Sequence, residues 1–230
     1  MQRILSLLVF GTGPLPDVLI RVSPWIDCRY VVVGRDSRDV FMSMWNHYRS
    51  YTDVMYAVTA AGDPPGGPLP RCPDDIRWLW SQWLTRASFE WEPDGWPFWS
   101  HHYHAAAWWE FRDLENVLLV HYNDLLADLE AEMRRVAAHV GIAVAEESWP
   151  ALVDAARFES MKREGARLLG PMERFAGGAD TFLYKGSNGR WRDVLTEEDL
   201  RLYDKAAGSL DPGLRVWLEA GGRPPVGGGG

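Results

Sequence analysis

The chain has 230 residues, of which 47% are hydrophobic and 24% are charged, as in an ordinary soluble domain that buries a core. This composition excludes global disorder and fibrous repeats. Lys and Arg number 24 against 32 Asp and Glu, so the formal net charge is -8, which argues against general electrostatic binding to nucleic acid or to an anionic membrane. Any anion that this protein binds must therefore be held by a local site.

The cysteine content and the hydropathy pattern indicate in which cellular compartment the protein is expected. Only Cys28 and Cys72 are present, and their wide separation indicates neither a disulfide framework nor a cysteine zinc site. No run approaches the ~20 apolar residues that a membrane span needs, so no membrane span is expected. The simplest location is the reducing cytoplasm.

Two segments have the pattern of strands in a buried parallel sheet. The first is Tyr30 to Val33, a β-branched run, and the second is residues 117–122. A helix is predicted to begin near Ser37 with Asp36 as its N-cap residue. A long amphipathic helix is predicted over 125–140 after the second strand.

The other segments are mainly helical. Helices are predicted at 4–9, around Trp78, Trp80 and Trp83, around 101–109, and at 147–163, 197–207 and 213–219. Residues 57–73 are predicted to form a surface loop and 164–190 an irregular segment. Strands that alternate with helices indicate an α/β fold, here a single domain over 1–222 with a frayed tail at 223–230. Two strands are too few for a sheet of the usual five or six.

The strongest local signal lies where the first strand turns into a helix, at residues 34–38. Such a turn presents free backbone N–H groups and the positive end of the helix dipole, and Arg35 adds a fork of donors suited to phosphate oxygens. The hydroxyl of Ser43 lies on the second turn, where it could join them. The alternative is a solvated capping loop with surface arginines, and these residues alone leave both interpretations open.

A second signal is the glycine-rich basic segment at residues 185–192. Its glycines allow close backbone approach, and three cations in eight residues could wrap an anion. The segment does not match the Walker pattern, and no GxGxxG follows a strand. A solvated turn with basic residues is the alternative.

Three histidines, His101, His102 and His104, form the third signal. Residues 101 and 104 share a helix face, but no further metal ligands lie at useful spacing, so no metal is expected. A single histidine of this group could serve in an active site, because imidazole titrates near neutrality. Otherwise these are interface or core-edge histidines.

Five segments stand out when they are taken in order: YVVVGRDSRDVFMSMWNHY (30–48), PFWSHHYHAAAWW (97–109), NVLLVHYNDL (116–125), FESMK (158–162) and FLYKGSNGRWRD (182–193). Together they resemble the soluble sulfotransferase family, in particular its bacterial branch, which uses 3'-phosphoadenosine 5'-phosphosulfate (PAPS) as donor. The resemblance implies a P-loop-NTPase-like parallel sheet flanked by helices, here with an incomplete sheet. It also implies binding of PAPS and of its product 3',5'-adenosine bisphosphate (PAP), without a metal.

The resemblance assigns cofactor contacts residue by residue. The family's contacts to the 3'-phosphate and the adenine fall on Arg35, Ser43, Tyr122, Phe158, Lys185 and Gly186. The family's Arg-Lys-Gly triplet is altered, because Tyr184 stands where the arginine is expected. One charge-assisted contact to the 3'-phosphate is therefore missing from the motif.

The acceptor side is assigned in the same way. Counting back from the Trp pair at 108–109 puts the family's substrate-pocket histidine at His104, whereas counting forward from Trp99 favours His102. The expected acceptor is a small, partly apolar molecule with a hydroxyl or an amine, in a pocket lined by tryptophans. A homo-oligomer is left open.

Catalytic residues are not identified, because the family's leaving-group lysine and catalytic histidine have no counterpart in the printed sequence. A non-catalytic nucleotide-binding or scaffold relative is thus the alternative function. A carbohydrate or lipid binding module is a third hypothesis, and it requires Trp78, Trp80 and Trp83 to be exposed.

Overall fold

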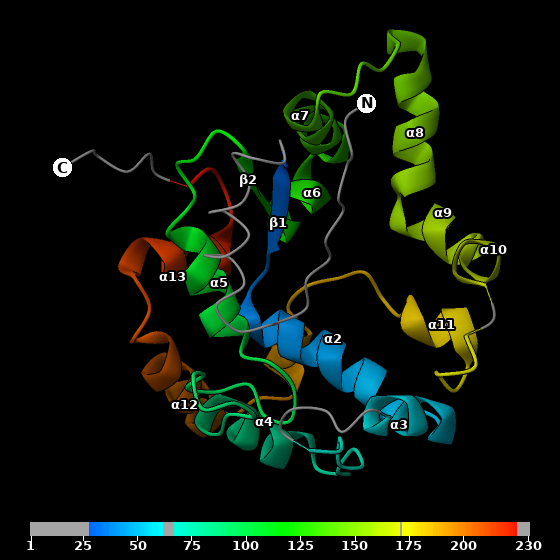
Figure 1. Cartoon of the computed structure of the whole chain (residues 1–230). Helices are drawn as coiled ribbons and strands as arrows, with labels where there is room; N and C mark the ends of the chain where they lie inside the picture. Colours follow the sequence, from blue (N-terminus) through cyan, green and yellow to red (C-terminus); the bar gives the residue numbers. More distant parts are fainter. Residues whose placement is uncertain (1–27, 62–66, 171, 225–230) are drawn as a thin grey trace.

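A computed structural model describes residues 28–61, 67–170 and 172–224. The helix predicted at 4–9 and residues 225–230 of the predicted tail lie outside this range. The described part is mainly helical around one small sheet (Figure 1).

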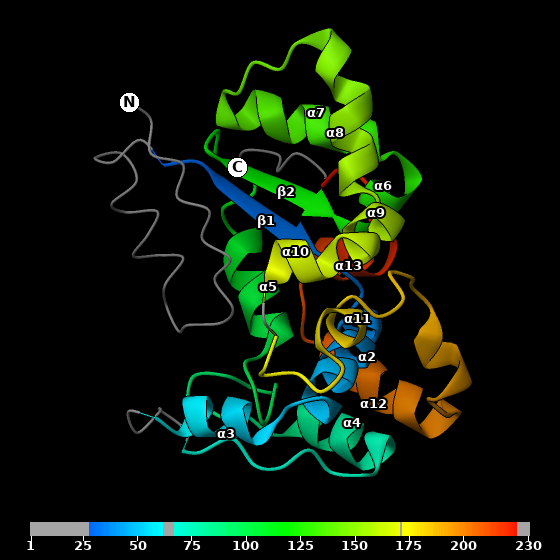
Figure 2. The ribbon, with the colours of Figure 1, turned by 90° about the vertical axis from the view of Figure 1, so that its right-hand side faces the viewer.

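The sheet consists of β1 (Tyr30–Gly34) and β2 (Val117–His121), which confirms both predicted strands. The strands run parallel, with Tyr30 opposite Val117 and Gly34 opposite His121 (Figure 2). No third strand joins them within the described residues. The α/β fold with an incomplete sheet is therefore confirmed. Because parallel strands end on the same side, the residues after β1 and after β2 come together at one edge.

Helices cover the sheet and extend well beyond it. Their bounds are α2 (Ser37–Arg49), α3 (Asp53–Ala60), α4 (Ile76–Thr85), α5 (His101–Trp109), α6 (Tyr122–Ala127), α7 (Leu129–Val140), α8 (Trp149–Ala156), α9 (Phe158–Arg163), α10 (Gly165–Leu169), α11 (Gly178–Phe182), α12 (Glu197–Ala207) and α13 (Pro212–Ala220), with short 3-10 helices η1 (Glu146–Ser148) and η2 (Arg190–Asp193).

Two apolar cores hold these elements together. In the first, side chains of β1 and β2 pack against α5 and α13, with Trp108, Trp109 and Trp217 all nearly buried. In the second, α2 packs against α4 and α12, and the fully enclosed Phe41 and Trp80 lie at its centre with ring centroids 4.9 Å apart. The loop that leaves β1 passes from the first core to the second (Figure 1).

Local chemistry explains where several helices begin. The side chain of Asp36 accepts a hydrogen bond from the Arg38 backbone, so it is the N-cap residue of α2 as predicted. Thr196 and Asp199 form a capping box at the start of α12. Gly141 ends α7 in the left-handed region, at φ 75°.

The structure corrects four of the predicted segments. The 57–73 loop begins later, because α3 extends to Ala60. The 125–140 helix is two helices, since Asp128 leaves helical geometry and its carboxylate caps α7 by accepting from the Ala131 backbone. The 147–163 helix is interrupted at Arg157, and the irregular 164–190 segment contains α10 and α11.

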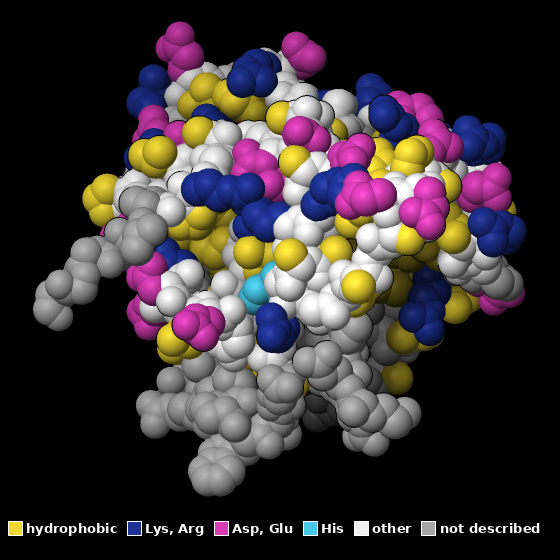
Figure 3. Space-filling view, turned by 90° about the horizontal axis from the view of Figure 1, so that it is seen from above, with side chains coloured by type: hydrophobic (Ala, Val, Ile, Leu, Met, Phe, Trp, Pro, Cys, Tyr) yellow, Lys and Arg dark blue, Asp and Glu magenta, His cyan; other side chains and the backbone are white. Residues whose placement is uncertain are grey.

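The surface shows no concentration of one charge sign on the face seen from above, where acidic and basic side chains are interspersed (Figure 3). Part of this mixing comes from ion pairs, as where Arg134 contacts both Glu130 and Glu146 at 2.8 Å. None of the described helices has the length and apolar character that crossing a bilayer requires.

Substitution of two tryptophans on α4, one buried and one exposed, tests how much the second core contributes to the free energy of unfolding. Trp80 is fully buried and donates from Nε1 to the Asp199 backbone at 3.0 Å, whereas Trp78 is 46% exposed. We expect Trp80→Ala to lower the free energy of unfolding by about 3–5 kcal/mol in urea titrations, and Trp78→Ala by less than about 1.5 kcal/mol. Equal losses would contradict the packing described here.

Candidate functional site

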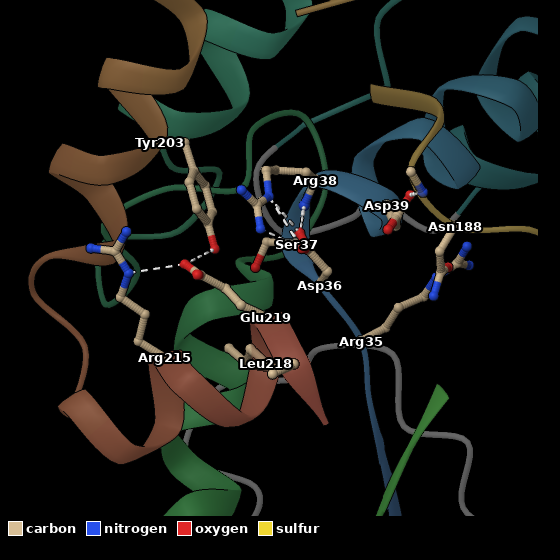
Figure 4. A network of polar contacts seen from close by, with 12 residues as sticks. Arg35, Asp36, Ser37, Arg38, Asp39, Asn188, Tyr203, Arg215, Leu218 and Glu219 are labelled. Carbon is tan, nitrogen blue, oxygen red and sulfur yellow. Dashed lines mark hydrogen bonds and ion pairs between the residues drawn. The ribbon is translucent and has the colours of Figure 1, made fainter. Parts of the chain in front are cut away.

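The candidate site begins at the turn between β1 and α2. Gly34 has no side chain, and a Cβ at this position would lie 2.2 Å from the Trp217 indole, so only glycine allows α13 to pack there. Asp36 follows, almost fully buried, and the Arg38 guanidinium bonds both of its carboxylate oxygens (Figure 4). The turn is therefore held rigidly where it leaves the sheet.

Arg35 is the residue of this turn that connects distant parts of the chain. Its Nε donates to Asn188 Oδ1 at 2.9 Å, and its Nη2 donates to the Ser187 carbonyl at 3.2 Å (Figure 4). Its guanidinium also lies 4.2 Å from the ring centroid of Tyr122, the first residue of α6. Burial lowers the pKa of Arg35, yet an arginine stays charged at neutral pH.

The loop of residues 184–190 forms the opposite wall. Gly186 has φ 62°, and its carbonyl accepts from the Tyr122 hydroxyl at 3.2 Å. A Cβ at Gly186 would lie 2.4 Å from the ring of Phe158, so the aromatic ring sits directly against the glycine. The Gly189 backbone donates to Asp39 Oδ1 at 2.7 Å, which ties the end of this loop to α2.

The structure thus brings most of the predicted nucleotide contacts into one neighbourhood. Arg35, Tyr122, Phe158 and Gly186 are linked by direct contacts, and Lys185 is the exposed residue between Tyr184 and Gly186. Ser43 lies two turns into α2, half-buried.

A cleft of about 680 Å³ opens beside the loop. One of its walls is α2, and the other walls are α11, the 184–190 loop and η2. Its charged lining residues are the basic Arg49, Lys185 and Arg190 and the acidic Asp193, and its aromatic ones are Trp45 and Tyr184. The cleft therefore combines positive charge with aromatic surface, which suits an anionic ligand that has a flat apolar part.

His101 lies closest to the turn among the three predicted histidines. Its Nδ1 is 3.0 Å from the hydroxyl of Ser37, the first residue of α2. Burial lowers the pKa of His101 to about 3, and the neighbouring imidazoles and Arg35 add to the effect. The imidazole is consequently neutral at pH 7 even though part of its surface is accessible.

His102 and His104 occupy different environments. His102 is buried between the rings of Trp83 and Tyr203, and its Nδ1 lies 2.7 Å from Asp94 Oδ2. His104 is only partly buried, and burial lowers its pKa. Trp99 stands 39% exposed just before α5. Within the described residues, no group of three or more His, Cys, Asp or Glu is placed to hold a metal ion.

Several site residues were not predicted. Asn188 and Asp39 position Arg35 and the loop, and Ser37 holds His101, but each lies far along the chain from its partner. All three residues lie in segments that were singled out from the sequence, at 30–48 and 182–193, but nothing in those segments showed which distant partner each would contact. For His101, the predictions chose its neighbours because spacing to the nearby tryptophans does not show which histidine faces the turn.

Comparisons with known proteins agree on one family. The model of the sulfotransferase domain matches residues 15–210. The chain is 26% identical to a glycolipid sulfotransferase of Mycobacterium bovis (strain BCG / Pasteur 1173P2) over 281 aligned residues, which cover 96% of this chain and 84% of the relative. It is 25% identical to sulfotransferase 1C2 of Rattus norvegicus over 185 residues, which cover 79% of this chain and 54% of the relative.

Solved structures share the fold. Mouse sulfotransferase SULT7A1, complexed with PAP, is 18% identical with a TM-score of 0.60, and the match covers 83% of this chain. Retinol dehydratase, in complex with androsterone and PAP, is 23% identical with a TM-score of 0.55 over 84% of this chain. The chain spans 61% of the mouse protein and 48% of retinol dehydratase.

The low pKa of His101 predicts a dependence of stability on pH. Unfolded His101 takes up a proton below its ordinary pKa of about 6.5, whereas the folded imidazole does not, so acid favours the unfolded state by about 1.4 kcal/mol per pH unit. When the pH is lowered from 7 to 5, we expect the free energy of unfolding of His101→Asn to fall by about 2 kcal/mol less than that of the parent protein. Urea titrations at both pH values test this. If the free energy of unfolding of the variant and of the parent protein depends on pH in the same way, the folded imidazole takes up a proton as it does in water, which contradicts the low pKa.

Proposed function

The chain belongs to the sulfotransferase family, and on that premise we propose that it transfers a sulfuryl group from PAPS to a hydroxyl or amine of a small acceptor. The observation that supports this most is that Tyr122 and the 184–190 loop both contact Arg35. The half-buried Arg35 guanidinium stacks on Tyr122 and bonds the 184–190 loop, so charge for a phosphate lies beside an aromatic surface for a base.

The described residues fit this nucleotide in two respects. Arg35, Lys185 and Ser43 would hold the 3'-phosphate, while Tyr122 and Phe158 would contact the adenine. The close approach of the Phe158 ring to Gly186 supports this assignment, because it brings the aromatic surface within reach of the loop that carries Lys185. The nucleotide, when bound, supplies an activated sulfuryl group.

Contacts from the loop prepare Arg35 for this role. Hydrogen bonds to Asn188 and Ser187 fix the guanidinium before any ligand arrives, so less conformational freedom is lost on binding. The aromatic face of Tyr122 covers one side of the cation, and Nε and Nη2 bond the loop, so Nη1 is the donor that remains for an anion among the described residues. These residues therefore bind and orient the donor.

For the acceptor we favour His104 over His102. Asp94 already occupies Nδ1 of His102, which is only 4% exposed. His104 is accessible, and its lowered pKa keeps the imidazole neutral at pH 7, so it can accept a hydrogen bond from a hydroxyl. With Trp99 exposed nearby along the chain, this region suits a partly apolar acceptor. The glycolipid and androsterone named for the relatives support that class.

Location and domain organisation follow as proposals. Cys28 and Cys72 are both free, which supports a reducing compartment such as the cytoplasm. The family model spans residues 15–210, which supports one domain over 1–222.

A non-catalytic nucleotide-binding relative remains the second candidate function. The observation that favours it is Tyr184, an uncharged residue at the position of the family's arginine, and 41% exposed. Such a protein would bind PAP without turnover. The third hypothesis, a carbohydrate or lipid binding module built on three exposed tryptophans, is wrong, since Trp80 and Trp83 are buried.

Calorimetric titration with PAP tests the proposed donor site. We expect micromolar affinity for the parent protein and a loss of at least about tenfold for Arg35→Ala, because charge-assisted hydrogen bonds contribute about 1.5–3 kcal/mol. Arg201→Ala is the matched control, since its side chain is 70% exposed on α12 and should leave the affinity unchanged.

Two further outcomes separate the candidate functions. Transfer of labelled sulfate from PAPS to a panel of phenols, steroids and glycolipids would support the enzyme. Tight PAP binding without any transfer would favour the non-catalytic relative. No binding of PAP by the folded protein would contradict both.

A further inference from the structure

Arg190 lies against Tyr184, the residue that departs from the family's motif. Its guanidinium carbon is 5.2 Å from the centroid of the Tyr184 ring, and Lys185 Nζ is 5.3 Å from the same centroid. Two cations therefore share one aromatic ring. Lys185 and Arg190 also line the same cleft beside α2.

The guanidinium of Arg190 is not saturated by the protein. Its Nε is buried and has no hydrogen-bond partner within the described residues. No carboxylate lies within ion-pair distance of Arg190, Arg35 or Lys185 in that same part of the chain, although most of its other buried or half-buried arginines have one. A buried donor without a partner costs free energy, so an absent acceptor is indicated.

Positive charges outnumber negative ones around Arg190. Asp39 is the nearest carboxylate, and one of its oxygens accepts from the Gly189 backbone at 2.7 Å. Burial is the main cause that lowers the pKa of Arg35, and the charge of Arg190 lowers it further. The cleft is lined by three cations, Arg49, Lys185 and Arg190, and by the carboxylate of Asp193, so in a chain of net charge -8 it favours an anionic ligand.

The backbone fixes Arg190 on both sides. Gly189, at φ 84°, allows the turn into η2 and is anchored to Asp39 through its N–H. On the other side, the Trp191 ring lies 4.3 Å from the guanidinium of Arg38, which itself bonds Asp36. Arg190 is thus held between the two anchors, while Arg192 is exposed at the surface.

We propose that Arg190 supplies the cation that Tyr184 lacks, and that it binds the 3'-phosphate of the nucleotide together with Arg35 and Lys185. The charge that the family's motif places at position 184 is delivered here from six residues further along the loop. This inference rests on the proposed function, because it concerns the same donor site.

Calorimetry with two nucleotides tests the proposal. PAP carries a 3'-phosphate and adenosine 5'-phosphate does not. Only the affinity for PAP should therefore depend on Arg190. We expect Arg190→Ala to weaken PAP binding at least tenfold and adenosine 5'-phosphate binding less than twofold. Arg192→Ala, two residues away and exposed, should change neither. The double variant Tyr184→Arg, Arg190→Ala should recover most of the PAP affinity, which also shows that the loop still folds.

The possible failures are distinguishable. If Arg35→Ala abolishes PAP binding while Arg190→Ala leaves it unchanged, the donor site stands and the role of Arg190 is overturned. An equal loss for both nucleotides without rescue by Tyr184→Arg would also overturn it. If the parent protein binds PAP no better than adenosine 5'-phosphate, the proposed function fails, and the inference fails with it.

Discussion

The ion pair between the buried Asp36 and Arg38 joins the end of β1 to the helices that surround the candidate site. A carboxylate in a residue that is only 5% exposed needs a partner, and the Arg38 guanidinium bonds both of its oxygens. The same guanidinium lies between Trp191 and Tyr203, at 4.3 and 4.7 Å from their ring centroids. The Asp36 carboxylate thus caps α2, and the guanidinium that it holds contacts η2 through Trp191 and α12 through Tyr203; Figure 4 shows Tyr203 beside Arg38.

The parts of the fold that could be predicted are those that local chemistry decides. A β-branched run identified β1, and a capping Asp identified the start of α2. The break at Asp128 escaped prediction because the apolar spacing continues across it, so periodicity alone reads one helix. The short helices α10 and α11 have five residues each, too few for a periodic pattern.

Some residues of the candidate site could be predicted and others could not, because several of its contacts join residues far apart in the sequence. Resemblance named Tyr122, Phe158 and Gly186, and the structure brings these three together. The contacts that position Arg35 join residues 153 and 152 positions apart, and no local pattern encodes such a pair. The same holds for the contact between Ser37 and His101, which depends on how α5 approaches the turn.

The contact between Gly34 and Trp217 has a consequence for how the chain folds during synthesis. Trp217 fills the space beside the first strand, although the two residues are separated by most of the described sequence. Contacts of such long range form late, since the loop between them must close first. On the ribosome, the core around β1 and β2 therefore stays open until α13 has emerged, and the apolar faces of both strands must be kept from other partners until then.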